Sequence, residues 1–175
     1  MTTIVVRDAR PDDDAAVRAL TRRAYAEYAT VMDAEAWGAL AAAIEDALAG
    51  APGARRLVAE RAGTLVGSVL LFPPATNAYG EMADASPWPE LRLLAVDPAA
   101  RGLGVAERLV AACVDAARAM GARELGLHTS SSMRTARRLY ERLGFQRAPE
   151  RDFRPPGAEV VEGFRLRLDP RPPGD

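Results

Sequence analysis

Residues 91–106 join an apolar strand pattern to a glycine-containing turn and the start of a long helix pattern. Gly102 and Gly104 leave the backbone free to turn its N–H groups outward. The helix start adds unpaired N–H groups and partial positive charge, and together these features suit a pyrophosphate. Arg101 contributes a formal positive charge beside the turn. We therefore interpret residues 101–106 as a candidate phosphate-binding turn.

Two common phosphate-binding motifs do not fit this turn. A dinucleotide-binding fingerprint requires Gly or Ala three residues after its second glycine, and that position is Glu107. A Walker loop requires a Gly-Lys pair, but all 23 basic residues of the chain are arginine. The absence of lysine also excludes a Schiff-base lysine and a pyridoxal phosphate anchor.

The composition narrows the class of protein further. With 175 residues, 49% of them apolar, and a net charge of -1, the chain is expected to form one soluble domain that binds neither nucleic acid nor membrane. The single Cys113 and single His128 exclude a disulfide framework and a Cys/His zinc site, so no metal is expected. The first residues contain no apolar core of secretory length. These features predict a cytoplasmic protein in a reducing bacterial cytosol.

The apolar spacing predicts an alternation of strands and helices. Helical spacing runs from Val17 to Val31, from Trp37 to Leu48, over about 104–120 and over 133–143. Residues 73–89 form an irregular connection, which we expect to border the substrate. Strands are predicted at 4–6, 57–60, 65–72, 90–96, 125–129, 145–151 and 160–168. This order favours an α/β fold, a mixed sheet with helices on both faces.

Two segments together resemble a known superfamily. The spacing of Arg101, Gly104 and Ala106 after a strand resembles the acyl-CoA signature of the GNAT N-acyltransferases. Downstream, residues 136–145, with a tyrosine shortly before Gly-Phe, resemble the second signature of that superfamily. The element order matches over roughly residues 3–168. We therefore expect one GNAT-like domain over 1–169, with 170–175 as a disordered tail.

The resemblance implies a mixed, mostly antiparallel sheet that splays between its fourth and fifth strands, with acetyl-CoA as cosubstrate. The pantetheine arm is expected to pair with backbone groups of Leu94 and Val96, and the pyrophosphate with the turn. One departure is Met133, where many members have Asn, and this puts one pantetheine or helix-capping contact in doubt. The cofactor-binding residues implied are Leu94, Ala95, Val96, Arg101, Gly102, Leu103, Gly104, Val105 and Ala106.

Tyr140 is the candidate general acid that the second signature implies. A thiolate leaving group has a conjugate-acid pKa near ~8.5, taking cysteine as a guide, and a phenol with a pKa near ~10 stays protonated at neutral pH. Its hydroxyl can therefore donate a proton or hydrogen bond to the departing sulfur. The structural alternative is a helix residue whose ring lies in the core beside Leu139 and Leu143.

An attacking alkyl amine must also lose a proton. With a pKa of about ~10.4, such an amine is almost entirely protonated at pH 7, so a base or water relay is required. Glu90 opens the strand and resembles in position the base of histone-type members; it could equally be a solvated strand-entry residue. His128 is the rival base, and Glu27 and Tyr28 could touch the acceptor.

The predicted function is an N-acetyltransferase that moves the acetyl group of acetyl-CoA to a primary amine by direct attack. The acceptor is not decided by any residue. Dimers are common in the superfamily, so the resemblance leaves both a monomer and a homodimer as alternatives. The sequence indicates no interface. Cys113 lies on the apolar stripe of its helix and is expected to be a core residue rather than a nucleophile. The alternative function is a catalytically silent acyl-CoA sensor or interaction module.

Overall fold

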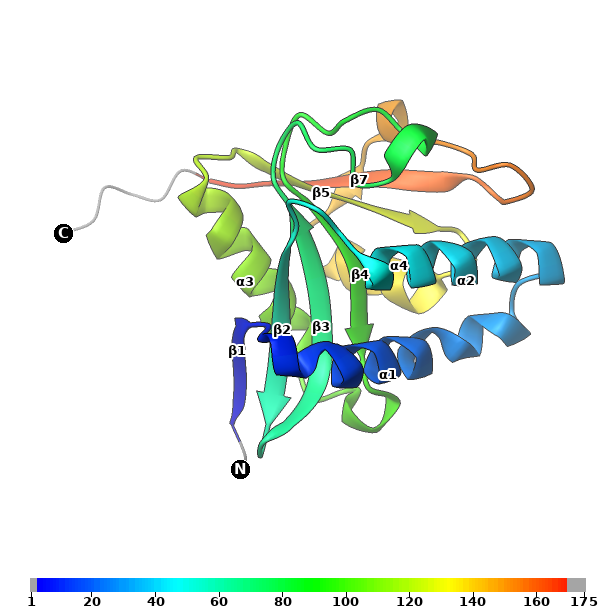
Figure 1. Ribbon diagram of the computed structural model, residues 1–175. Coiled ribbons are helices and arrows are strands. Elements are labelled where there is room, and N and C mark those ends of the chain that lie inside the picture. The colour runs from blue at the N-terminus through cyan, green and yellow to red at the C-terminus, as the bar shows by residue number, and fades with distance from the viewer. Residues whose placement is uncertain (1–2, 170–175) are drawn as a thin grey trace.

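The computed structural model describes residues 3–169 and contains a seven-stranded sheet in the order β1-β2-β3-β4-β5-β7-β6 (Figure 1). The strands are β1 (Ile4–Asp8), β2 (Arg55–Arg61), β3 (Thr64–Phe72), β4 (Glu90–Val96), β5 (Glu124–Ser130), β6 (Gln146–Arg147) and β7 (Val161–Arg167). The α-helices are α1 (Asp14–Tyr25), α2 (Ala34–Ala49), α3 (Val105–Ala119) and α4 (Arg134–Arg142). The tail prediction for 170–175 lies outside the described residues.

The sheet is antiparallel except between β4 and β5, which run parallel. These two strands share one register pair, Glu90 with Gly126, and part from there onward. By contrast, β5 and β7 pair along their full length, from Glu124 opposite Arg167 to Ser130 opposite Val161. The predicted mixed sheet with a splay between its fourth and fifth strands is confirmed.

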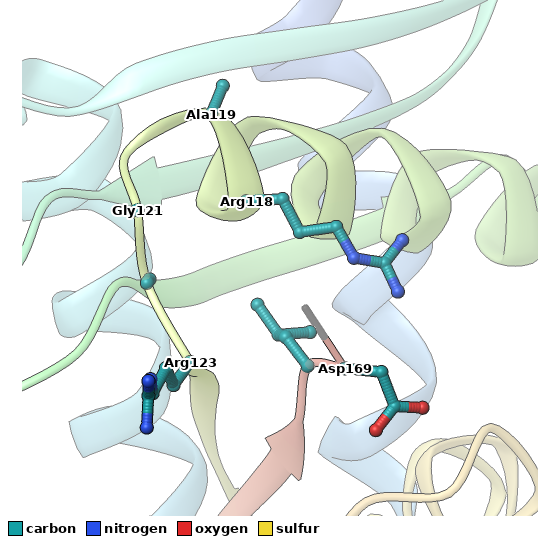
Figure 2. A pocket seen from close by; sticks show the side chains of 7 residues that line it. Arg118, Ala119, Gly121, Arg123 and Asp169 are labelled. Atoms are coloured by element: carbon teal, nitrogen blue, oxygen red, sulfur yellow. The ribbon is translucent and has the colours of Figure 1, made fainter. Parts of the chain in front are cut away.

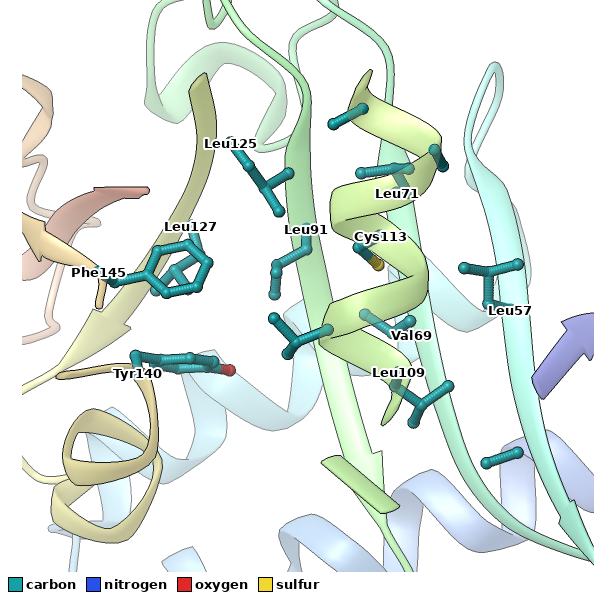
Figure 3. Packing of buried hydrophobic residues seen from close by; sticks show 14 of the residues in the cluster. Leu57, Val69, Leu71, Leu91, Leu109, Cys113, Leu125, Leu127, Tyr140 and Phe145 are labelled. Atoms are coloured by element: carbon teal, nitrogen blue, oxygen red, sulfur yellow. The ribbon is translucent and has the colours of Figure 1, made fainter. Parts of the chain in front are cut away.

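Helices cover both faces of the sheet because neighbouring strand residues point to opposite sides. On β2, Leu57 and Ala59 face the cluster that contains Leu109 and Cys113 of α3. Val58, between them, faces the cluster formed by α1 and α2. Figure 3 shows how α3 lies across the strands of the first cluster, with its side chains directed onto the sheet. The layer arrangement expected from the element order is therefore confirmed.

The helix starts follow local signals of different strength. The side chain of Asp33 caps α2 by accepting a hydrogen bond of 2.8 Å from the Ala36 N–H. Gly104 precedes α3 with a left-handed φ of 75°, which glycine adopts without strain. Met133 precedes α4 and gives no side-chain cap. The α4 start thus lacks the side-chain hydrogen bond that an Asn at this position can supply.

Two predicted elements are shorter in the structure. The first helical segment ends as α-helix at Tyr25 rather than near Val31, because residues 26–30 tighten into a 3₁₀ turn. The strand predicted over 145–151 contains only Gln146–Arg147. Pro149 has no N–H to donate and instead begins a 3₁₀ turn that ends at Arg151. Within residues 3–169, no helix is both long and apolar enough to span a membrane.

Gly67 on β3 permits the close approach of α3 to the sheet. A Cβ at this position would lie 2.6 Å from Val105 Cγ1 and 2.9 Å from Leu109 Cδ1. Both neighbours are buried in the core, so they have little room to retreat. The absent side chain therefore sets the depth at which the first turns of α3 pack on β3 and β4.

We expect Gly67→Ala to lower the free energy of unfolding by about 1 to 3 kcal/mol, because it overpacks the α3 contact. The matched control is Gly38→Ala on α2, where an added Cβ meets no atom within 4 Å. That change should stabilise the helix by about 0.5 to 1 kcal/mol. Urea denaturation of both variants measures the difference, and equal stability of the two would contradict this account of Gly67.

Candidate functional site

A cavity of about 330 Å³ lies where β4 and β5 part. Its walls come from α1, β4, the turn before α3, β5 and α4. The candidate residues that line it are Leu94, Val96, Arg101, Gly102, Gly104, Val105, Ala106 and Tyr140. Ala95 is buried in the sheet and Leu103 is exposed to solvent, and neither lines the cavity. Most of the predicted cofactor residues and Tyr140 therefore face one space.

The turn before α3 presents open backbone to this cavity. Gly102 and Gly104 both have a φ of 75°, and a Cβ at either position would meet no protein atom within 4 Å. The first N–H groups of α3 have no partner within the helix, and the helix dipole places partial positive charge there. The geometry thus fits the pyrophosphate role expected for residues 101–106.

Arg101, in contrast, is engaged within the protein. Its guanidinium donates to the Glu27 carboxylate at 2.6 Å and to the Ala24 carbonyl at 3.2 Å. Both charged side chains are more than 40% exposed, so this ion pair contributes about 1 kcal/mol at most. Arg101 can therefore exchange Glu27 for a phosphate at small cost. Glu27, which was expected to touch the acceptor, lines the cavity beside the turn.

The β4 backbone is distorted beside the cavity. Leu93 has a left-handed φ of 58°, and the register with β3 shifts between Ser68 and Leu70. A leucine holds this conformation only when its surroundings fix it, and Leu93 packs against the α1 and α2 clusters on that face. The Tyr25 hydroxyl donates to the Leu94 carbonyl at 3.1 Å. A carbonyl oxygen has two lone pairs, so it can accept a second hydrogen bond.

Tyr140 lies on α4 with its ring packed edge-on against Phe145, at 5.8 Å between ring centroids. Figure 3 shows its hydroxyl directed away from Phe145 and toward β4. Burial raises the pKa of Tyr140 well above its ordinary value of 10.0. The ring of Tyr140 therefore packs in the core, and the residue also lines the cavity.

Glu90 and His128, the two rival bases, are hydrogen-bonded to each other. The contact joins Glu90 Oε1 to His128 Nδ1, and the two side chains are 4% and 3% exposed. His128 Nε2 lies 2.8 Å from the Arg151 carbonyl oxygen, which can only accept, so Nε2 carries a proton. A second proton must then lie between Nδ1 and Oε1. The pair is therefore net neutral, and His128 has no free nitrogen.

Aromatic rings enclose the back of His128. Tyr79 meets its ring at 4.8 Å and Phe153 at 5.1 Å, measured between centroids. Tyr79 belongs to the irregular 73–89 connection, and its hydroxyl has a raised pKa chiefly because it is buried. None of residues 73–89 lines the cavity. The connection expected to border the substrate thus reaches the site through Tyr79, behind His128.

The cavity lining also includes residues that were not singled out from the sequence, among them Tyr25, Arg92 and Thr129. The Thr129 hydroxyl is buried and has no hydrogen-bond partner, which is unusual for a buried polar atom and suits a ligand in the cavity. Thr129 ends the predicted strand at the splay, so its position was a usable signal. Nothing distinguishes Arg92 in a chain with 23 arginines.

Other candidate groups lie apart from this cavity. Burial raises the pKa of the Cys113 thiol to about 12, so the thiolate needed for nucleophilic attack does not form near neutral pH. Among residues 3–169, no three His, Cys, Asp or Glu side chains are placed to hold a metal. A second cavity of about 310 Å³ lies at the opposite end of α3, between Arg118, Arg123 and Asp169 (Figure 2).

Comparison with known proteins relates this architecture to enzymes. Residues 15–145 match the acetyltransferase (GNAT) family. A mycothiol acetyltransferase from Sanguibacter keddieii is 39% identical over 92 residues, which are 53% of this chain and 28% of that protein. An IAA acetyltransferase from Azospirillum brasilense is 34% identical over 113 residues, which are 65% of this chain and 67% of that protein. The chain thus spans less than a third of the first relative.

A solved structure shares the fold. The GNAT family acetyltransferase from Brucella melitensis, in complex with acetyl-CoA, superposes with a TM-score of 0.58 at 24% identity. The superposition covers 99% of this chain and 94% of that one.

We expect Gly104→Glu to abolish acetyl-CoA binding, because a carboxylate would enter the turn and repel a pyrophosphate. Gly121→Glu is the matched control: it has the same φ of 75° and equally open surroundings, at the other end of α3. Calorimetric titration with acetyl-CoA measures both variants and the wild type. Equal loss of binding in both variants would mean that backbone strain, and not the turn itself, explains the effect.

Proposed function

Because the chain belongs to the acetyltransferase (GNAT) family, we propose that it transfers the acetyl group of acetyl-CoA to a primary amine by direct attack, with Tyr140 as general acid. One observation carries the proposal: a single cavity, open between β4 and β5, is lined both by the glycine turn and by Tyr140. The glycine turn and a protonated hydroxyl would thus serve the two ends of the pantetheine arm, the pyrophosphate and the thioester sulfur.

The turn and β4 would bind the cosubstrate. Beyond Glu90, the β4 edge that faces β5 has no strand partner, so an extended pantetheine arm can lie along it as an added strand would. Thr129 offers a buried hydroxyl from the opposite wall. It supplies a polar contact to the arm near the place where Met133 supplies none.

Tyr140 would assist the departure of the sulfur. Its raised pKa keeps the phenol protonated across the neutral range. The same low-polarity surroundings disfavour a free thiolate, so the departing sulfur gains basicity and draws the phenolic proton. The hydroxyl therefore donates its proton only when negative charge develops on the sulfur.

Glu90 would receive the amine proton. His128 occupies Oε1, and no residue of the described chain hydrogen-bonds to the second carboxylate oxygen, Oε2. His128 lines the cavity whereas Glu90 lies behind it, so a water relay must connect the amine to this oxygen. His128 is then a positioning residue, locked by Glu90 and the Arg151 carbonyl.

We expect Tyr140→Phe to lower kcat about 100-fold or more, the scale typical of a lost general acid. Tyr79→Phe is the control, because it removes a buried hydroxyl outside the cavity. Because the pKa of Tyr140 is raised, kcat should also show no fall from Tyr140 ionisation between pH 6 and 9. An unchanged kcat in Tyr140→Phe contradicts the assignment. Acetyl-CoA binding without turnover on an amine panel favours the silent acyl-CoA-binding module.

We expect Glu90→Gln to lower kcat/KM for an alkyl amine about 100-fold at pH 7, with the deficit shrinking toward pH 10. Without the base, the variant must capture neutral amine, whose fraction rises about tenfold per pH unit below the amine pKa of about ~10.4. The pH profile of kcat/KM measures this effect. A deficit that stays constant with pH indicates that Glu90 only positions His128.

A further inference from the structure

Arg92 is the cavity arginine without a carboxylate partner. Of the three arginines that line the space, Arg101 pairs with Glu27 and Arg142 with Glu107, each at 2.6 Å. No carboxylate of residues 3–169 pairs with Arg92. Its positive charge is therefore left for a group that the chain does not supply.

The guanidinium of Arg92 is held in place, but most of its N–H donors form no hydrogen bond within the described residues. Nη1 donates to the Ala78 carbonyl at 2.8 Å, and the group stacks on the Tyr79 ring at 4.6 Å from its centroid. A guanidinium has five N–H donors in a planar fork, so four remain after this bond. Arg92 is half-buried and lines the cavity, so these donors can reach a ligand bound there.

The neighbouring titratable groups do not cancel this charge. Glu90 precedes Arg92 by two positions on β4, and strand geometry puts the two side chains on the same face. Yet the Glu90–His128 pair holds a proton between its members and is net neutral. The ion pairs of Glu27 and Glu107 are also neutral. The cavity wall therefore carries one net positive charge, at Arg92.

We propose that the acceptor amine carries a carboxylate, as an amino acid does, and that Arg92 binds this carboxylate. The inference rests on the proposed function and narrows its substrate class. A planar guanidinium matches a carboxylate with two parallel hydrogen bonds, and one positive charge matches its single negative charge. A phosphate dianion would bring a second negative charge that no free cation of the cavity balances.

The reaction is then balanced within the site. The amine nitrogen forms a bond to the acetyl carbon, and the carbon–sulfur bond breaks. Before attack, the acceptor ammonium gives one proton through water to Glu90 Oε2, and Glu90 releases it to solvent. The sulfur then takes the Tyr140 proton and leaves as the thiol. The second proton lost by the nitrogen passes through water and Glu90 to the Tyr140 phenolate, which restores both groups. Arg92 stays charged throughout and orients the acceptor from its carboxylate end.

The test compares acceptors that differ only in the carboxylate. We would measure kcat/KM for 4-aminobutyrate, 5-aminopentanoate and 6-aminohexanoate against propylamine, butylamine and pentylamine, and for L-phenylalanine against phenethylamine. All rates are expressed per neutral amine. We expect the best acid to exceed its matched amine by about 10- to 100-fold, the scale of a charge-assisted bidentate contact.

Arg92→Met should remove this preference by lowering kcat/KM for the acid, and Arg92→Lys should retain part of it. Arg167→Met is the charge-matched control, because Arg167 is exposed and lies outside the cavity. It should keep the wild-type preference. If Arg92→Met does not fold, the wild-type comparison of acids and amines tests the inference by itself.

The outcomes separate the two proposals. Equal use of acids and amines by the wild type overturns the carboxylate assignment and leaves amine acetylation standing. Preference for O-phosphoethanolamine over every acid overturns the carboxylate in favour of a phosphate. Failure of every amine, with acetyl-CoA binding intact, overturns amine acetylation and this inference with it.

Discussion

The separation of β4 from β5 is the constraint on which the site depends. The parallel pair is joined at Glu90 and Gly126, where the Gly126 N–H also donates to the Pro89 carbonyl at 2.8 Å. Trp88 packs into the space that a side chain at position 126 would occupy, since a Cβ there would lie 2.2 Å from its Nε1 atom. The junction is fixed at this end, and beyond it the two strands separate around the cavity.

In an ordinary sheet the open edge of β4 would be destabilising, because unpaired backbone groups are costly when buried. Here the surrounding elements supply part of the missing hydrogen bonding. Tyr25 of α1 donates to the Leu94 carbonyl, while the Leu93 backbone departs from regular strand geometry. The Thr129 hydroxyl stays without a partner on the other wall. The fold thus keeps a polar, ligand-sized gap in a sheet that is otherwise paired.

The sequence by itself determined the frame, since its signals are local. Apolar periodicity locates most elements to within a few residues. The turn at Gly102 and Gly104 can be predicted from the sequence because a positive φ and the start of a helix depend on residues that are neighbours in the chain. Tyr140 followed from its motif. The strand that Pro149 cuts short was the clearest local error, and proline chemistry explains it.

Tertiary structure alone decided how the charges combine. Glu90 and His128 are 38 positions apart and form one neutral unit, and Arg101 meets Glu27 across 74 positions. Spacing along a chain carries no information on such pairings, because they follow from which strands and helices come to lie side by side. The role of Arg92 becomes apparent only in the folded structure, because there every other charged side chain that lines the cavity has an oppositely charged partner. The chemical type of each residue can be read from the sequence, whereas the net charge of a cavity depends on which residues the fold brings together.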